Sequence, residues 1–354
     1  MYGDTRRNLH PLYVSPIGKG GVDLGIQNIT RSVQRAGHSP MLRRLPHWAN
    51  FAPFAAPLLL GPRWWQGFDI VQGRSRVAWA LKRRGLPLVT TVHHLTTDPQ
   101  LQPYSSPAQR LFYHTLEYLY DGLSIKRADG VVCVSRYTQQ QTALVYGKLS
   151  TTVVYDGIDT DVFVPTADGG RSDHGLPTTN ARIRLLFVGN RTRRKGFDLL
   201  PQIMDRLPLD HTLFYTESFQ TVQAAPPHPR MVPIGTPDRA GLVAAYQSCD
   251  LLLFPTRVEG FGIVAAEAGA CGRPVVTTDA GALPEVVDDG VTGYLCRRDD
   301  IDDYVEKITR LADDLQLRSA MGVAARAKIV AQFGYEQLAL GLLDVYQQLL
   351  STGA

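Results

Sequence analysis

The sequence predicts an α/β protein with two Rossmann-like domains that face each other across a cleft. A chain of 354 residues is too long for one ordinary domain, which favours two. In both halves, short apolar segments alternate with helical segments of about ten residues or more, a pattern typical of parallel sheets with helices on both faces. A polar stretch rich in Gly, Pro and Asp interrupts this alternation near the middle of the chain.

These observations predict the domain boundaries. We expect an N-terminal domain over residues 1–165, a linker over 166–180 and a C-terminal domain over 181–335. The last segment, 336–354, has the pattern of a helix, and we expect it to return to the N-terminal domain. Two such domains bind ligands at the carboxyl ends of their strands, so candidate functional residues are sought there.

The alternation begins with the strand PLYVSP, which a Gly-rich turn joins to a helix that ends at Gly37. The other elements expected in the N-terminal half are strands at 68–73, 86–94 and 129–135 and helices at 75–85 and 106–127. The C-terminal half is expected to contain strands at 183–190, 211–216, 230–235, 251–256, 273–279 and 293–297, helices at 196–207 and 238–249, and three helical segments at its end.

The composition is that of a globular protein, with 44% hydrophobic and 20% charged residues. The N-terminus lacks the apolar core of a signal peptide, and three prolines interrupt the most apolar stretch, 49–65. We therefore expect a cytoplasmic protein without a transmembrane segment. The four cysteines contain no C-x-x-C pair, and we interpret them as free buried thiols of a reducing compartment: Cys133, Cys249, Cys271 and Cys296.

The net charge of +4 is unevenly distributed along the chain. Through Pro165 there are 18 Lys and Arg against 10 Asp and Glu, whereas the remainder has 19 against 23. A basic N-terminal half indicates an anionic partner, for which the candidates are a membrane surface, a phosphorylated lipid and nucleic acid, the last favoured least. A solvated basic face explains the same charge equally well.

Basic and aromatic side chains are interleaved in the segment 43–65. Such a mixture suits a lipid-linked acceptor or peripheral contact with the inner face of a membrane. The alternative is a buried packing element of the N-terminal domain. The residues concerned are Arg43, Arg44, Trp48, Phe51, Phe54, Arg63, Trp64 and Trp65.

The most informative motif is VEGFGIVAAEAG, which follows the strand at 251–256. We expect a helix to begin near Gly262 or Ile263, so that unpaired N–H groups at its start form an anion site. Glu259 then lies in the turn, and Glu267 lies about one turn into the helix, where it can accept hydrogen bonds from two adjacent hydroxyls. This arrangement fits a sugar and a ribose held around a diphosphate. The alternative is an acid that only stabilises the start of a helix.

A second strand, turn and helix carries a basic cluster in the segment FVGNRTRRKGFDLL. Its cations follow a strand end, where they can neutralise charge on a departing diphosphate. Two of the four cations are explained equally well as a solvated loop. We expect Lys195 and one arginine to be functional; the other cations are Arg191, Arg193 and Arg194.

The N-terminal half offers weaker candidates at its strand ends. Gly20 and Gly21 follow the first strand, in a turn that lacks the full dinucleotide-binding pattern. His93 closes the strand at 86–94, and a structural histidine is the alternative. Ser135 either belongs to the site or caps the helix that follows it. No spacing typical of a metal site occurs, so we expect neither a metal ion nor a cofactor.

Taken together, these motifs resemble those of the retaining glycosyltransferases of the large fourth family, which have the GT-B fold. The segments that carry the resemblance occur in the family's order along most of the chain. The pair of glutamates with its PVV and PEVV followers is the most specific of them. The other segments are GKGGVDLGIQNITRSVQRAGH, LVTTVHH, ADGVVCVSRYT, VVYDGIDTDVF and LLFVGNRTRRKGFDLL.

The resemblance implies roles for the candidate residues. Glu267 would accept hydrogen bonds from the donor ribose, and Glu259 and His93 would contact the donor sugar. Lys195 and a neighbouring arginine would hold the diphosphate, which Gly20 and Gly21 would cover. The remaining donor-binding positions are Gly189 at a strand end and the backbone around the helix start, at Gly260, Phe261, Gly262, Ile263 and Val264.

Two positions depart from the family's pattern. Asn190 stands where the family often has an arginine, so that role passes to another arginine, and we favour Arg194 because it adjoins Lys195. Asp156 replaces the usual asparagine of the NGID turn. We expect this turn to be chiefly structural.

The function implied is metal-independent transfer of a sugar, with retention, from a nucleoside-diphosphate sugar of UDP or GDP type. The acceptor would be a hydroxyl group of a glycan, a lipid-linked compound or a small molecule, in glycan biosynthesis. Two alternatives remain open: a nucleotide-sugar 2-epimerase, and a non-catalytic nucleotide-sugar-binding protein.

Overall fold

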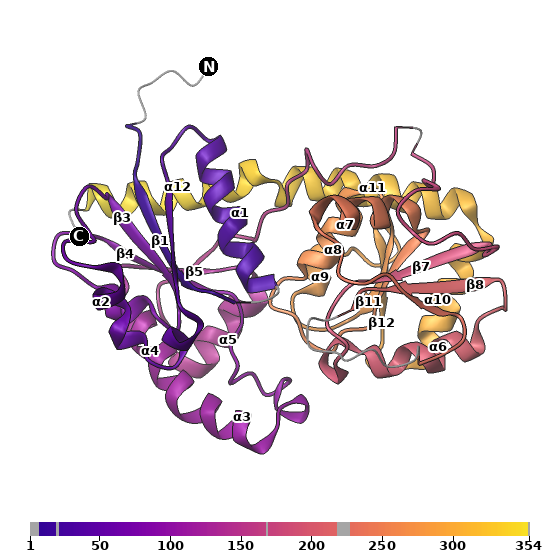
Figure 1. The fold of residues 1–354 in the computed structure, drawn as a ribbon, viewed down its shortest axis with the longest axis horizontal. Helices are drawn as coiled ribbons and strands as arrows, with labels where there is room; N and C mark the ends of the chain where they lie inside the picture. Colours follow the sequence, from indigo (N-terminus) through magenta and orange to yellow (C-terminus); the bar gives the residue numbers. More distant parts are fainter. Residues whose placement is uncertain (1–6, 19–20, 168, 218–226, 353–354) are drawn as a thin grey trace. The chain divides into compact units, whose positions relative to one another are not determined.

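The structure of the chain is a computed structural model, and it describes residues 7–18, 21–167, 169–217 and 227–352. The chain divides into two compact units, which we call unit 1 (Met1–Gly157 with Tyr335–Ala354) and unit 2 (Ile158–Gly334). Each unit contains a six-stranded sheet whose paired strands are all parallel (Figure 1). The predicted fold class, with two Rossmann-like domains, is therefore confirmed.

The sheet of unit 1 has the strand order β2-β1-β3-β4-β5-β6. Its strands are β1 (Pro11–Pro16), β2 (Met41–Leu45), β3 (Ile70–Arg74), β4 (Leu88–Val92), β5 (Gly130–Cys133) and β6 (Thr152–Val153). Its helices are α1 (Gly21–Arg35), α2 (Ala56–Leu60), α3 (Pro107–Phe112), α4 (Tyr118–Arg127), α5 (Arg136–Tyr146) and α12 (Tyr335–Ser351).

Alternate residues of β1 belong to two different cores, because successive side chains of a strand point to opposite faces. Tyr13 packs with Ile26 of α1 and Leu342 of α12. Its neighbours Leu12 and Val14 belong to a second core, to which other elements of unit 1 contribute. Both faces of the sheet are therefore covered.

The last helix of the chain belongs to unit 1, as the sequence predicted. In Figure 1, α12 runs beside α1, and its residues Leu338, Leu342 and Tyr346 are buried in the core that contains Tyr13. The hydroxyl groups of Tyr346 and Tyr13 lie 3.2 Å apart. The chain thus begins and ends in the same unit.

The sheet of unit 2 has the strand order β12-β11-β10-β7-β8-β9. Its strands are β7 (Ile183–Phe187), β8 (His211–Tyr215), β9 (Met231–Pro233), β10 (Leu251–Phe254), β11 (Val275–Thr278) and β12 (Gly293–Cys296). Its helices are α6 (Leu200–Arg206), α7 (Arg239–Ser248), α8 (Ile263–Ala270), α9 (Leu283–Val286), α10 (Ile301–Asp313) and α11 (Leu315–Phe333). The central strands β7, β10 and β11 are buried along their whole length, as expected of a parallel sheet covered on both faces.

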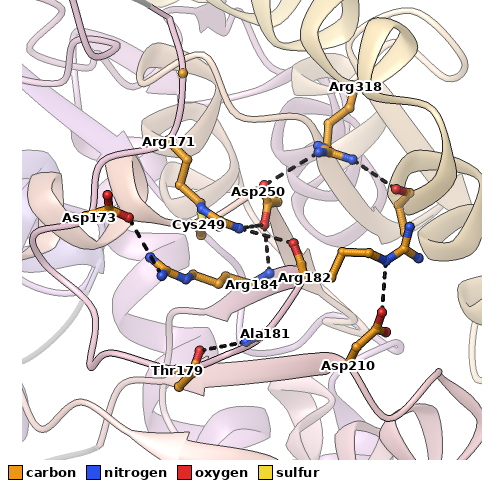
Figure 2. A network of polar contacts seen from close by, with 12 residues as sticks. Arg171, Asp173, Thr179, Ala181, Arg182, Arg184, Asp210, Cys249, Asp250 and Arg318 are labelled. Carbon is orange, nitrogen blue, oxygen red and sulfur yellow. Dashed lines mark hydrogen bonds and ion pairs between the residues drawn. The ribbon is translucent and has the colours of Figure 1, made fainter.

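The predicted linker, 166–180, is instead a loop of unit 2, and the chain passes between the units after Gly157 and Gly334. Figure 2 shows why: Arg171 donates from this loop to the Oδ2 atom of Asp250 at 2.7 Å, and Asp250 also accepts from the backbone N–H of Arg184. A polar composition predicted a linker, but the ion pair with buried Asp250 fixes the segment to the sheet. The boundary predicted at residue 165 is therefore eight residues too late.

Two other elements of unit 1 differ from the prediction. The helix expected at 75–85 is a single turn, Ala78–Leu81. The edge strand β2 was not predicted, because two of its five residues are arginines, which are not typical of a strand. The helical segment expected at 106–127 is confirmed from Pro107 to Arg127, where a wider π-helical turn at Tyr113–Glu117 joins α3 to α4.

The aromatic residues of 43–65 have different environments in the structure. Trp64 is 8% exposed and packs in the core of unit 1 with Val71 and Leu81, so the packing alternative is correct for it. Phe51, at 53%, and Phe54, at 65%, are exposed.

The four cysteines are buried, free thiols, as predicted. Within the described residues, no helix combines the length and hydrophobicity that crossing a bilayer requires.

Candidate functional site

The turn between β10 and α8 has the geometry that the sequence predicted. The helix α8 begins at Ile263, directly after Gly262, whose φ is 103°. Only glycine adopts this conformation readily, and a Cβ atom there would also come within 2.8 Å of Leu283. The N–H groups of Ile263 and Val264 lie in the first turn of the helix, where an α-helix provides no acceptor for them. They form a suitable place for an anion.

The basic turn at Arg193–Lys195 lies against the end of β10, although 64 residues separate Lys195 from Glu259. Gly196 allows this approach, because its φ is 72° and a Cβ atom there would collide with the carbonyl oxygen of Pro255. The backbone N–H of Arg257 donates to the carbonyl oxygen of Arg194 at 2.9 Å. The two strand ends are thus joined through their backbones.

Glu259 is the centre of this contact. Its Oε1 atom lies 2.5 Å from Lys195 Nζ, 2.8 Å from Thr256 Oγ1 and 3.6 Å from Arg194 Nη1. Burial alone would raise the pKa of Glu259, but Lys195 and Arg194 outweigh it and hold that pKa below its ordinary value. Burial lowers the pKa of Lys195 although Glu259 acts in the opposite direction. The site therefore holds an ion pair with a second cation beside it.

Arg194 is the arginine whose side chain accompanies Lys195. Its Nη1 atom also donates to the carbonyl oxygen of Val258 at 3.2 Å. The guanidinium group of Arg191 instead lies over the ring of Phe197, 5.0 Å from its centroid. Arg193 is exposed and pairs with Asp198. Of the three arginines in this turn, Arg194 is therefore the one that lies beside the ion pair of Lys195 and Glu259. It is also the arginine favoured above for the role that Asn190 cannot fill.

A residue that the sequence did not single out fixes this arrangement. Arg257, 4% exposed, donates through Nη1 and Nη2 to the carboxylate of Asp198 at 2.7 and 3.0 Å. It also donates to Asp299 and to the carbonyl oxygen of Arg193. Arg257 thereby fastens the basic turn to the end of β10. Only its place beside the glutamate motif signalled it in the sequence.

Glu267 has a different environment from Glu259. It is the fifth residue of α8, 6% exposed, and its Oε2 atom accepts a hydrogen bond from Tyr246 at 3.0 Å. Burial raises the pKa of Glu267 to about 7, against the smaller lowering effects of Tyr246 and Arg239. Tyr246, on α7, was not predicted, because its distance from Glu267 depends on how the two helices pack. Gly189 follows β7, and its N–H donates to Thr216 Oγ1 at 3.0 Å.

In unit 1, His93 lies directly after β4 and is 8% exposed. Its Nδ1 atom is 3.6 Å from Asp156 Oδ2, and its ring lies so close to Gly25 of α1 that a Cβ there would be 2.9 Å from Cε1. Asp156, expected to be chiefly structural, thus contacts a candidate catalytic residue. Ser135 caps α5 by accepting from the N–H of Thr138, which is the alternative given above.

Gly21 is the first residue of α1, whereas Gly20 lies outside the described residues. In the part of the chain that the structure describes, no three His, Cys, Asp or Glu residues lie together as a metal site would require. The arrangement at the end of β10 therefore offers cations, backbone donors and two carboxylates for binding an anionic, hydroxyl-rich ligand.

Solved structures with a similar fold include a sucrose-phosphate synthase and proteins whose titles name them as glycosyltransferases. Sucrose-phosphate synthase from Thermosynechococcus elongatus matches with a TM-score of 0.82 and 19% identity, over 98% of this chain and 100% of its own. Anabaena HepE in complex with UDP and glucose matches with a TM-score of 0.73 and 18% identity, over 95% and 99%. The fold is thus the GT-B fold of glycosyltransferases.

Sequence comparison identifies the family. Residues 16–162 match the family described as Glycosyltransferase Family 4, and residues 182–314 match Glycosyl transferases group 1. The chain belongs to Glycosyltransferase Family 4 and is a glycosyltransferase that uses a nucleotide sugar.

Two relatives illustrate the family. The D-inositol 3-phosphate glycosyltransferase of Mycolicibacterium smegmatis is 29% identical over 303 residues, which is 80% of this chain and 68% of the relative. The lipopolysaccharide core biosynthesis mannosyltransferase LpsB of Rhizobium meliloti is 29% identical over 243 residues, 64% of this chain and 67% of the relative.

The raised pKa of Glu267 predicts a pH-dependent stability. The carboxyl group of Glu267 loses its proton near pH 4.5 in the unfolded chain and near pH 7 in the folded protein. Its contribution to the free energy of unfolding should therefore fall as pH rises between these values. Glu267→Gln should remove this fall, and the stability of the variant relative to wild type should increase from pH 4.5 to pH 7. Urea denaturation across this window measures it, with exposed Glu336→Gln as the control. A difference between Glu267→Gln and wild type that stays constant with pH would contradict the prediction.

Proposed function

We propose that this enzyme transfers the sugar of a nucleoside-diphosphate sugar to an acceptor hydroxyl with retention of anomeric configuration and without a metal ion. The observation that carries the proposal is the contact of Lys195 and Arg194 with Glu259 beside the first turn of α8. Two cations and free backbone donors at one strand end suit a diphosphate of the UDP or GDP type.

The two glutamates would bind different parts of the donor. Glu267 is held by Tyr246, and its ionised carboxylate would accept hydrogen bonds from the ribose hydroxyls. Glu259 would accept from the sugar hydroxyls, next to the backbone of residues 260–264. His93 of unit 1 would contact the sugar, as the family resemblance implies. Gly20 and Gly21 would cover the diphosphate, and Gly189 would leave room for it.

Without donor, the charges of Lys195 and Glu259 neutralise each other at 2.5 Å. A bound diphosphate would give Lys195 and Arg194 a second anionic partner. Their contacts with the carboxylate of Glu259 would weaken, and that carboxylate could then accept hydrogen bonds from the sugar. As the bond from the anomeric carbon to the phosphate oxygen breaks, the leaving diphosphate gains negative charge. Preorganised donors at such a position contribute roughly 3 kcal/mol each to the stabilisation of a transition state.

The acceptor oxygen would attack the anomeric carbon from the face that the diphosphate leaves, which preserves the configuration. The proton of the acceptor hydroxyl would pass to the departing phosphate oxygen, so no protein base is needed. The charge of Lys195 and Arg194 would do for the diphosphate what a divalent cation does in other transferases. The presence of these two cations beside the proposed diphosphate site supports a reaction without a metal ion.

The acceptor would be a hydroxyl group of a glycan, a lipid-linked compound or a small molecule. Relatives are named for D-inositol 3-phosphate and for the lipopolysaccharide core, so the family includes acceptors of different size. The basic N-terminal half, with 18 Lys and Arg against 10 Asp and Glu through Pro165, supports an acceptor or a neighbouring surface that is anionic. Peripheral contact of unit 1 with a membrane would serve a lipid-linked acceptor.

Nucleotide binding tests the donor site. A ligand that binds only the folded protein raises the melting temperature, because it stabilises the protein by RT ln(1 + [L]/Kd). Among nucleoside diphosphates and sugar nucleotides, UDP or GDP and one of its sugars should raise it most in a thermal-shift assay. Lys195→Met should remove most of this shift. Arg193→Met, in the same turn but at an exposed side chain that pairs with Asp198, should retain it. No shift with any nucleotide, or equal loss in both variants, would contradict the proposed donor site.

Product configuration tests the reaction course. With the donor and acceptor that react, the first product seen by proton NMR should have the anomeric configuration of the donor. The rate should be unchanged by excess EDTA. An inverted product would exclude same-face attack, and loss of activity with EDTA that is restored by a divalent cation would exclude a metal-independent reaction. Conversion of the donor sugar without any acceptor would instead indicate an epimerase.

A further inference from the structure

Unit 1 has an open hollow of about 560 Å³ that no part of the proposed reaction uses. It is lined by Phe54, Trp79, Ala80, Lys82 and Arg127. Lys82 precedes β4, and Arg127 is the last residue of α4, just before β5. The hollow therefore lies toward the amino ends of these strands. His93 follows the opposite, carboxyl end of β4, so a ligand in the hollow leaves the candidate catalytic residue uncovered.

The floor of the hollow is aromatic. Trp79 stacks on Tyr120, with ring centroids 6.0 Å apart and an angle of 23° between the planes. The guanidinium group of Arg127 lies 5.7 Å from the centre of the Trp79 ring. The indole Nε1 atom of Trp79 is buried without a hydrogen-bond partner in the described part of the chain. A flat aromatic surface with a cation above it suits an anionic group attached to an apolar body.

The cations around the hollow outnumber the acids. Lys82 pairs with Asp129, but Arg127 has no ion-pair partner among the described residues. The neighbouring Arg83, Arg84 and Lys126 are exposed as well. A second copy of this chain would bring the same positive charge to the surface, which disfavours self-association there. An anionic partner is favoured instead.

Apolar side chains project next to these cations. Phe54 is 65% exposed and Leu58 is 84% exposed. They are four residues apart in the consecutive helical turns Pro53–Ala55 and Ala56–Leu60, so they lie on the same side of the segment. Exposed aromatic and aliphatic groups beside Lys and Arg are typical of protein surfaces that enter the interfacial layer of a membrane.

We propose that this surface, formed by Phe54, Leu58, Trp79, Lys82 and Arg127, docks on an anionic membrane. One anionic lipid headgroup occupies the hollow against Arg127 and Trp79. Phe54 and Leu58 enter the boundary between headgroups and acyl chains. This proposal assigns a defined surface to the membrane contact of unit 1 that the proposed function names. The docking itself needs neither donor nor acceptor, so the docking and the sugar transfer can each fail without the other.

The segment 43–65 suggested such contact in the sequence, but the structure changes the residues involved. Trp64 is in the core, and Trp65 packs against that core with Arg83 4.3 Å from its ring centroid. Replacing these tryptophans would disturb the fold of unit 1. Phe54, Leu58 and Arg127 are exposed and can be replaced without opening a cavity.

Vesicle flotation tests the docking directly with the full chain. Wild-type protein should float with phosphatidylcholine vesicles that contain phosphatidylglycerol, and not with phosphatidylcholine alone. High salt should weaken the binding, because exposed charges are screened. Arg127→Glu, and separately Phe54→Ser with Leu58→Ser, should each lower the bound fraction at limiting lipid by roughly tenfold. Unchanged melting temperatures would show that the variants fold.

A matched control is available on α11 of unit 2. Leu315 and Val323 are 68% and 69% exposed and border a shallow apolar hollow that no charged side chain lines. Leu315→Ser with Val323→Ser removes a similar apolar area and should leave flotation unchanged. The proposal is overturned if wild type does not bind the anionic vesicles, if the control variant loses as much binding as the test variants, or if the surface binds RNA or a second copy of the chain and no vesicle.

Discussion

The ion pair between Lys195 and Glu259 is the interaction on which the donor half of this enzyme depends. Both side chains are largely buried, 14% and 12% exposed, and a buried charge without a partner is strongly destabilising. The pair therefore forces the turn after β7 and the turn after β10 to meet. Gly196 permits the close approach, and Arg257 fastens it through Asp198. A diphosphate that enters would find its cations already in place.

Two carboxylates of one short motif have acquired opposite properties from their surroundings. Glu259 stays ionised because two cations lie beside it, whereas Glu267 is in an apolar helix interface with one tyrosine as its hydrogen-bond partner. Burial acts in the same direction on both, so the neighbouring charges decide the difference. This contrast fits a division in which one carboxylate contacts the sugar beside the reacting bond and the other only anchors the nucleotide.

Local patterns in the sequence predicted most of the fold, and tertiary contacts account for what they missed. Alternating segments predicted both sheets, and the glycines before Ile263 predicted the start of α8. Arg257 could not be assigned, because its partner Asp198 is 59 residues away in the chain. The contact of Asp156 with His93 and that of Tyr246 with Glu267 likewise depend on packing. The loop at 166–180 was mistaken for a linker because composition does not reveal that Arg171 reaches Asp250.

The central claim is that the motif around Glu259 and Glu267 binds a nucleoside-diphosphate sugar. The most direct test is the kcat/KM of Glu267→Ala with the donor and acceptor that react, compared with wild type and with Glu336→Ala at an exposed position. Loss of hydrogen bonds to a charged group predicts a decrease of more than about tenfold in Glu267→Ala, carried mainly by the KM for the donor, and none in the control. A decrease of less than about tenfold in a folded Glu267→Ala variant would contradict the assignment of Glu267 to the ribose.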